Sequence, residues 1–347
     1  MNCMCGRRHL ILGSLAAGLF APTAPTAAAP TATAPTAAAK PRRIDVHHHI
    51  VPPTWYAALK QAKLDNPPMA SWSPAKSIDD MDKAGITTAI TSPTTPQVGF
   101  LRPNDAARVA REANEWARKL ATDHPGRFGV FAMLPMPHID ESLKEIAYVF
   151  DTLKVDGVGM MTNYGDKWLG YAELAPVFEE LNRRKAVVYT HPTGANCCVN
   201  LVRGVSDAAV EYGADTTRTI TNLIFSGASM KFKDINFIFS HGGGVLAAVA
   251  ERLRIQMVTT LPYMGKFTRE MVDHELKQFY YDTAQVSNEV TIQALAKLVG
   301  VSQIVFGTDY PYRTGAEHVS GLAKRFSKKD LAAIDSGNAL RILQKGF

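Results

Sequence analysis

The 347-residue sequence has few cysteines and lacks an apolar run long enough to cross a membrane. Cys197 and Cys198 are adjacent and poorly placed to join distant segments, and Cys3 and Cys5 lie near the N-terminus, which excludes a disulfide framework. The uncharged apolar run at residues 9–20 is short for a membrane span. A Gly-rich dinucleotide turn and a phosphate-binding loop are also missing, so no organic cofactor is expected.

Charge of one sign is not in excess either. Without residues 1–39, which hold two arginines and no acidic residue, 36 basic residues face 32 acidic ones. This balance excludes a nucleic-acid-binding footprint. Apolar residues make up 46% of the chain and charged residues 20%, which excludes a disordered protein.

Residues 1–39 differ in composition from the rest. Arg7 and Arg8 precede the apolar run, and residues 21–39 consist of ten Ala, five Thr and four Pro. Paired basic residues, a short apolar region and Ala-x-Ala sites are typical of an export signal. The segment resembles a bacterial twin-arginine signal, which implies the twin-arginine export machinery as a partner, cleavage after Ala29 or Ala39, and a periplasmic or secreted protein not integral to the membrane. An uncleaved signal anchor is the alternative.

Residues 40–347 alternate short β-rich runs with helical patterns. Strands are predicted at 43–49, 86–92, 127–134, 156–162, 186–191, 236–240, 279–283 and 303–307, and helices at 54–62, 77–84, 104–122, 140–153, 171–184, 205–231, 245–260, 289–299 and 328–343. Eight strand–helix units in about 300 residues predict one α/β domain, a (β/α)8 TIM barrel. In such a barrel the chemistry lies at the carboxyl ends of the strands.

Metal-ligating residue types stand at several of these predicted strand ends. His47 and His49 share one face of the first strand, because alternate residues of a strand point the same way, and His48 points away. His191 ends the fifth strand, His241 follows the sixth and Asp309 follows the eighth. Singly, each has a structural explanation, but together they predict a catalytic metal site.

Four motifs carry a resemblance to the amidohydrolase superfamily, and within it to the metal-dependent decarboxylase branch typified by aminocarboxymuconate-semialdehyde decarboxylase. They are residues 44–49 (IDVHHH), 190–193 (THPT), 239–244 (FSHGGG) and 306–311 (FGTDYP). Residues 163–165 (NYG) and 181–184 (LNRR) look more loosely like members that act on 6-methylsalicylate.

The resemblance implies that His47, His49, His191 and Asp309 ligate one divalent metal, and that His241 acts on metal-bound water or on substrate. Residues 157–163 contain neither the lysine nor the glutamate that bridges two ions in many relatives, so one metal is favoured. Zinc and manganese both suit this set of nitrogen and oxygen ligands.

The resemblance also implies non-oxidative decarboxylation of a small aromatic, hydroxybenzoate-like acid, with Asp309 or His241 as the general acid that protonates the ring. A carboxylate substrate favours an arginine partner. In the family an arginine at the position of Arg252 reaches the neighbouring subunit's site, which implies a homodimer; an exposed helix arginine is the alternative. Arg313 is a second candidate, and Trp72 is a candidate to cover the ring unless it packs on the surface.

Two other functions stay open. A hydrolase of the same superfamily, such as a lactonase acting on a small cyclic carboxylate, would share the ligands. An exported metal-binding protein without catalysis would share them as well. Release of CO2 from a hydroxybenzoate separates the decarboxylase from both.

Overall fold

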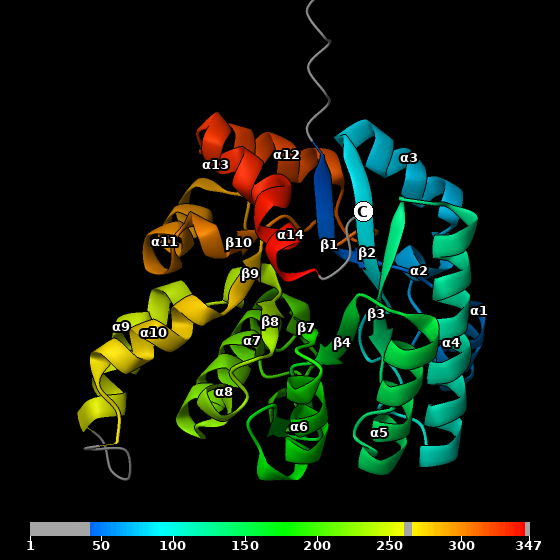
Figure 1. The fold of residues 1–347 in the computed structure, drawn as a ribbon, viewed down its shortest axis with the longest axis horizontal. Helices are drawn as coiled ribbons and strands as arrows, with labels where there is room; N and C mark the ends of the chain where they lie inside the picture. The colour runs from blue at the N-terminus through cyan, green and yellow to red at the C-terminus, as the bar shows by residue number, and fades with distance from the viewer. Residues whose placement is uncertain (1–41, 260–265, 344–347) are drawn as a thin grey trace, which may run out of the picture. The chain divides into compact units, whose positions relative to one another are not determined.

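The computed structural model describes residues 42–259 and 266–343. The export signal and the Ala/Pro/Thr tract of residues 1–39 therefore lie outside the described residues. The described chain is built around one sheet of eight parallel strands in the order β1-β2-β3-β4-β7-β8-β9-β10 (Figure 1). Their bounds are β1 Arg43–His49, β2 Ile86–Ser92, β3 Phe128–Met133, β4 Gly157–Met161, β7 Val187–His191, β8 Asn236–Phe239, β9 Tyr280–Asp282 and β10 Ile304–Val305.

The last strand returns to the first and closes the sheet. The N–H of Val46 donates to the carbonyl of Phe306 at 2.9 Å, and the N–H of Asp309 donates to the carbonyl of His47 at 2.8 Å. His49 N–H donates to Tyr310 O at 2.8 Å. Each of the eight predicted strands is present, and the predicted (β/α)8 barrel is confirmed.

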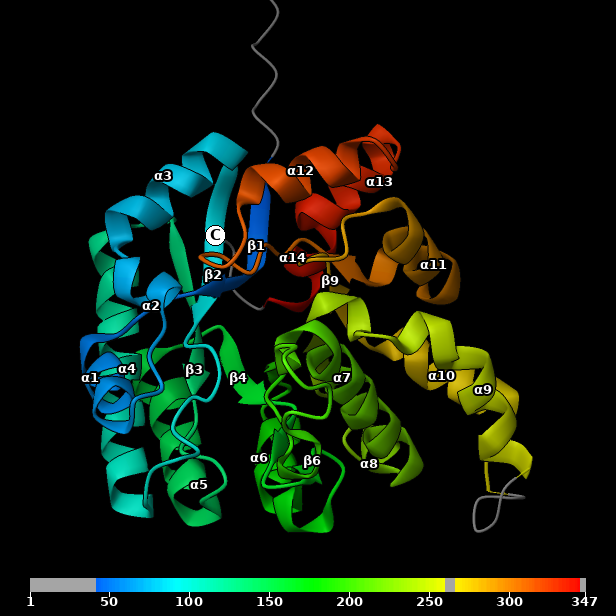
Figure 2. The ribbon, with the colours of Figure 1, turned by 180° about the vertical axis from the view of Figure 1, so that it is seen from behind.

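Helices follow the strands and surround them (Figures 1 and 2). They are α1 Pro53–Ala62, α2 Pro67–Ser71, α3 Pro74–Ala84, α4 Pro103–Asp123, α5 Ile139–Tyr148, α6 Ala175–Arg183, α7 Asp207–Phe225, α8 Ala228–Lys231, α9 Leu246–Thr259, α10 Arg269–Gln278, α11 Glu289–Val299, α12 Gly315–Ala323, α13 Lys328–Ala332 and α14 Asn338–Ile342. A hairpin of β5 (Asn163–Tyr164) and β6 (Lys167–Trp168) follows β4. The hairpin, α2, α10 and α12 were not predicted.

Side chains fill the barrel and the layer around it. Ile44, Val46, Phe131 and Tyr189 belong to an inner cluster that also contains Ala339 and Ile342 of α14 and the following Leu343. A larger outer cluster joins the strands to the surrounding helices. The interior is therefore a packed core that leaves the opposite, carboxyl end of the strands for a site.

The outer helices show the expected amphipathic pattern. In α4, Ala106, Val109, Ala110, Ala113 and Ala117 recur at helical spacing and are buried on one face. None of the helices in residues 42–259 and 266–343 combines the length and the apolar character that crossing a membrane requires.

Candidate metal centre

The structure brings five predicted residues together at the carboxyl end of the barrel. His47 and His49 lie at the carboxyl end of β1, and His191 is the last residue of β7. His241 follows β8, and Asp309 follows β10. All five are buried, with at most 9% of any of them exposed. The shared edge of a parallel barrel explains why residues more than 250 positions apart in sequence meet here.

Their ligand atoms face one another. His47 Nε2 lies 3.2 Å from His49 Nε2, and Asp309 Oδ1 lies 3.1 Å from each of these two nitrogens. His191 Nε2 lies 4.0 Å from Asp309 Oδ1, and His241 Nε2 lies 3.4 Å from Asp309 Oδ2. One ligand atom from each of His47, His191, His241 and Asp309 falls within 4.8 Å of all the others.

These spacings fit a divalent ion. Two donors about 2.1 Å from one ion, at angles of about 90–110°, stand about 3.0–3.4 Å apart, and donors on opposite sides stand about 4.2 Å apart. The His47, His49 and Asp309 atoms match the first value, and the His191–Asp309 pair is close to the second. Imidazole nitrogen and carboxylate oxygen are ligands that zinc and manganese both accept.

Outer hydrogen bonds orient three of the imidazoles so that Nε2 points inward. His47 Nδ1 contacts Asp282 Oδ2 at 2.7 Å, His49 Nδ1 contacts the carbonyl of Ser92 at 3.1 Å, and His191 Nδ1 contacts the carbonyl of Pro192 at 2.9 Å. Because each Nδ1 faces an acceptor, it carries the proton and the Nε2 lone pair is left for a metal.

The site attracts a cation. Burial opposes charge on His47, but the carboxylates of Asp282 and Asp309 outweigh it and raise the pKa of His47 to about 10 in the metal-free protein. Burial lowers the pKa of His49, and burial with the neighbouring imidazoles holds the pKa of His191 well below its usual value. Burial opposes ionisation of Asp309, yet the charge on His47 keeps its pKa well below the usual range. In the metal-free protein, a proton on His47 therefore supplies the positive charge beside these carboxylates that a bound metal ion would otherwise supply.

Asp282 was missed by the sequence analysis. It ends β9, is fully buried, and accepts the backbone N–H groups of His241 at 2.8 Å and Ala284 at 3.0 Å besides contacting His47. The signal used for Asp309, a carboxylate at the end of a predicted strand, applies equally to Asp282 and could have found it.

His48 points away from the centre, as strand alternation predicts. Its Nδ1 contacts Asp45 Oδ2 at 2.9 Å and its Nε2 contacts Ser77 Oγ at 2.6 Å, and its ring stacks on Tyr310. This Ser–His–Asp chain has no exposed member, since Asp45, His48 and Ser77 are all fully buried. We therefore read it as structural: it joins β1 to α3.

A cavity of about 470 Å³ opens beside the donors. His191, His241 and Asp309 form part of its wall, and the remainder is mainly small, apolar or hydroxyl-bearing, including Thr95, Ala208, Ala209, Tyr212, Val245, Val286 and Tyr312. Among the described residues that line it, none is a lysine or an arginine. The volume is typical of sites for small molecules.

The three predicted substrate-binding residues do not line this cavity in the single chain. Arg313 is half-exposed and pairs with Glu317, its Nε donating to a carboxylate oxygen at 3.1 Å. Arg252 is exposed on α9. Trp72 packs edge-on against Trp116, with ring centroids 5.9 Å apart.

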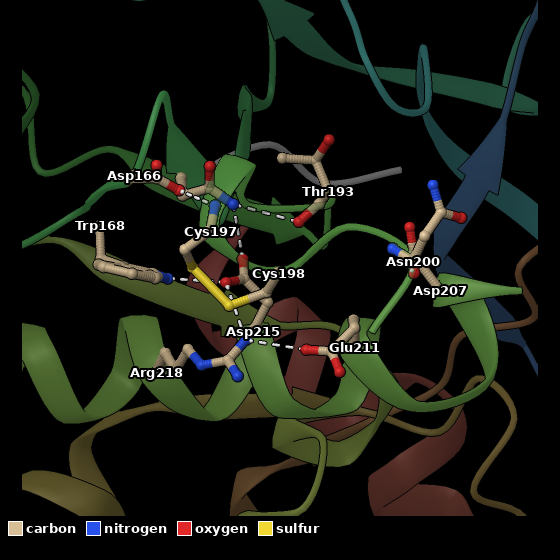
Figure 3. The surroundings of a disulfide bond; sticks show 11 residues. Asp166, Trp168, Thr193, Cys197, Cys198, Asn200, Asp207, Glu211, Asp215 and Arg218 are labelled. Atoms are coloured by element: carbon tan, nitrogen blue, oxygen red, sulfur yellow. Dashed lines mark hydrogen bonds and ion pairs between the residues drawn. A yellow bond between two sulfur atoms is a disulfide. The ribbon is translucent and has the colours of Figure 1, made fainter. Parts of the chain in front are cut away.

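A loop beside the cavity carries an unusual crosslink. Cys197 and Cys198 form a disulfide with each other, so within the described chain no distant segments are joined. Figure 3 shows the disulfide between Asp166, which accepts the N–H of Cys197 at 3.0 Å, and side chains of α7. One of these, Asp215, is buried and accepts Trp168 Nε1–H at 2.7 Å. Residues 196–206 include no buried side chain.

Residues 44–345 match the model of the family described as Amidohydrolase (Amidohydro_2). The chain is 36% identical over 289 residues to decarboxylase yanB of Aspergillus niger, covering 78% of this chain and 77% of that protein. It is 33% identical over 318 residues to 6-methylsalicylic acid decarboxylase acuB of Aspergillus aculeatus, covering 87% and 94%.

A solved structure shares the fold. The dihydroxybenzoic acid decarboxylase of Polaromonas sp., crystallised with manganese and the inhibitor 2-nitroresorcinol, superposes with a TM-score of 0.77. The match covers 87% of this chain and 97% of that one at 21% sequence identity.

Proposed function

Since the chain belongs to the amidohydrolase family, we propose that it is a metal-dependent, non-oxidative decarboxylase that releases CO2 from a small hydroxybenzoate-like acid. The resemblance to the decarboxylase branch is confirmed by relatives that are themselves named decarboxylases. The observation that carries the proposal is the cluster of buried imidazole and carboxylate donors, which faces a cavity large enough for an aromatic acid.

We assign the metal to His47, His49, His191 and Asp309. His49 is included because its Nε2 stands 3.2 Å from His47 Nε2 and 3.1 Å from Asp309 Oδ1, within the spacing of ligands on one ion. His241 lies nearest the other carboxylate oxygen, Oδ2, and is left for proton transfer. When bound, the ion would polarise the carboxylate and phenolate oxygens of the substrate. One ion is expected, and either zinc or manganese suits the ligands.

His241 and Asp309 are placed to move the proton that the reaction needs. Both line the cavity, and His241 Nε2 lies 3.4 Å from Asp309 Oδ2. Decarboxylation requires a proton at the ring carbon that bears the carboxylate. The C–C bond then breaks, CO2 leaves, and the electron pair of that bond restores the aromatic ring. His241, paired with Asp309, is the group we expect to deliver the proton.

The backbone at His241 and at Asp309 is strained. His241 has φ of 52° and Asp309 has φ of 64°, both in the left-handed region that residues with a side chain rarely adopt. Such strain gathers at active sites, where the surrounding structure holds it. Here Asp282 holds the N–H of His241, and the carbonyl of His47 holds the N–H of Asp309.

The decisive test is a panel of hydroxybenzoic acids and small cyclic lactones with added zinc or manganese. CO2 together with the ring-protonated phenol supports the decarboxylase. Ring opening without CO2 indicates the hydrolase instead, and metal binding without turnover of any compound indicates a binding protein. Either of the last two results contradicts the proposal.

We further propose a homodimer in which Arg252 supplies the cation for the partner's substrate. The exposure of Arg252 on α9, and a cavity without lysine or arginine among its described lining, support this arrangement. Sedimentation measures the oligomeric state. Mixing inactive Arg252→Ala and His241→Asn proteins should restore partial activity, because one site of each mixed dimer is then intact. No recovery in a proven mixed dimer contradicts the shared site.

Finally, we propose that residues 1–39 direct twin-arginine export to the periplasm or the medium. Arg7, Arg8 and the short apolar run support this. Replacing both arginines by lysine should retain the precursor inside the cell, as measured by fractionation. Export that continues unchanged contradicts it.

A further inference from the structure

Gln285 lies just after β9 on the wall of the cavity, in a strained conformation. Its φ is 57°, in the left-handed region that glycine or asparagine would adopt more easily. No sequence motif singled it out. A strained backbone conformation persists only where surrounding contacts hold it, and such positions gather at functional sites. The contacts of Gln285 therefore indicate what it does.

The backbone of Gln285 is held from outside the centre. Its N–H donates to His318 Nε2 at 2.9 Å, and His318 Nδ1 lies 2.9 Å from the carbonyl of Thr314. Because Nδ1 faces a carbonyl, we assign it the proton and Nε2 the lone pair that accepts from Gln285. His318 is 1% exposed and belongs to α12, so a buried ring on another element fixes this turn.

The side chain of Gln285 reaches the centre. Its Nε2–H donates to Asp309 Oδ2, the oxygen that also faces His241 Nε2 at 3.4 Å. The other oxygen, Oδ1, is turned toward the Nε2 atoms of His47 and His49, at 3.1 Å from each. The two oxygens of one carboxylate thus have separate sets of partners.

We propose that Gln285 is a positioning residue, whose amide holds Oδ2 of Asp309 and so keeps Oδ1 directed at the metal position. Without that donor the carboxylate is free to rotate about its Cβ–Cγ bond, and Oδ1 leaves the metal position. The identity of the ion rests on the proposed function, but the effect on metal binding is measurable without turnover.

The test compares Mn²⁺ dissociation constants, measured by competition with a chelator, for the full-length protein and three variants. Gln285→Leu keeps the bulk and removes the donor, and Gln285→Asn keeps an amide that tolerates left-handed backbone but is one methylene too short. Gln278→Leu, at the exposed end of α10, is the matched control. Both substitutions at 285 should weaken Mn²⁺ binding about 10–100-fold, and the control should not.

The outcomes separate the possible roles. With Mn²⁺ at saturating concentration, the KM of either variant should stay within about twofold of the wild type. Mn²⁺ affinity within twofold of the wild type in Gln285→Asn, or in a folded Gln285→Leu, overturns the proposal. A raised KM with unchanged affinity also overturns it, and shows that the amide contacts substrate instead. If no acid is decarboxylated but affinity falls as expected, the positioning role stands and the proposed function fails.

Discussion

Replacing Asp282 by asparagine should weaken metal binding although Asp282 is not itself a metal ligand. Oδ1 of Asp282 accepts the N–H groups of His241 at 2.8 Å and Ala284 at 3.0 Å, whereas Oδ2 alone faces His47 Nδ1 at 2.7 Å. An asparagine keeps both backbone donors only if its oxygen replaces Oδ1. Its NH2 then points at the protonated Nδ1 of His47, so two donors face each other.

The least costly relief is a change of His47 tautomer. Nδ1 gives up its proton and accepts from the new amide, while the proton on Nε2 stays; Nε2 is the atom that lies 3.1 Å from Asp309 Oδ1 and would bind the metal. Restoring a metal-binding tautomer breaks the new hydrogen bond. Loss of such an outer partner costs about 10–100-fold in metal affinity, or about 1.4–2.8 kcal/mol.

The assay is chelator competition for Mn²⁺, with Asp215→Asn as the matched control. Asp215 is also fully buried, and it accepts Asn163 Nδ2–H at 2.8 Å and Trp168 Nε1–H at 2.7 Å instead of facing a histidine of the metal centre. The control should lose stability and keep its Mn²⁺ affinity. An affinity in Asp282→Asn within twofold of the wild type would refute the tautomer argument.

Three further predictions concern single features of the site and its surroundings. His241→Asn should keep its metal content and lose about 10²–10⁴-fold in turnover, because it lacks the proton donor. The control His274→Asn, on the exposed face of α10, should keep both its metal content and its turnover. Normal turnover in His241→Asn would exclude His241 as the acid. In the metal-free folded protein the pKa of His47 is about 10, whereas in the unfolded chain it is about 6.5. The stability that this proton contributes is therefore fully present below about pH 6.5 and is lost as the pH rises toward about 10. Denaturant titrations should show this decline, and saturating Mn²⁺ should abolish it; a flat profile without metal contradicts the assigned charge. Replacing Cys197 and Cys198 by serine should change the free energy of unfolding by less than about 0.5 kcal/mol, because the bond encloses no intervening residue; a larger loss in denaturant titrations would show that this loop depends on the crosslink.

Much of the fold was predictable because its signals are local. The ranges 43–49 and 86–92 coincide with β1 and β2, and 289–299 coincides with α11. Each strand of a parallel barrel is buried on both faces and reads as a short apolar run, and each helix repeats its apolar residues at helical spacing. Regions with a weak or broken pattern were harder: 205–231 reads as one helix, but the structure ends α7 at Phe225 and starts α8 at Ala228, with Gly227 between them at φ of 78°.

The candidate site was predictable in its residue types but not in its connections. Donor residues at strand ends are visible in sequence because a barrel collects those ends on one side. The partner of a side chain is not, because His47 and Asp282 are 235 positions apart and no local pattern links them. For the same reason the sequence names Arg313 as a candidate carboxylate partner but does not show that its side chain pairs with Glu317 of α12, four residues further along the chain.

The sequence by itself determined the order of strands and helices, the end of the barrel that carries chemistry, and the choice of His47, His49, His191, His241 and Asp309, since these depend on periodicity and residue type. Only the tertiary structure decided how β1 presents its histidines. Val46 packs inside the barrel, so simple alternation would turn His47, the next residue, to the opposite face. The pairing of β1 with β2 shifts register between Asp45 and His48, and as a result Val46 and His47 both point inward. A register shift arises from pairing between two strands 43 residues apart, and a single strand's pattern contains no record of it.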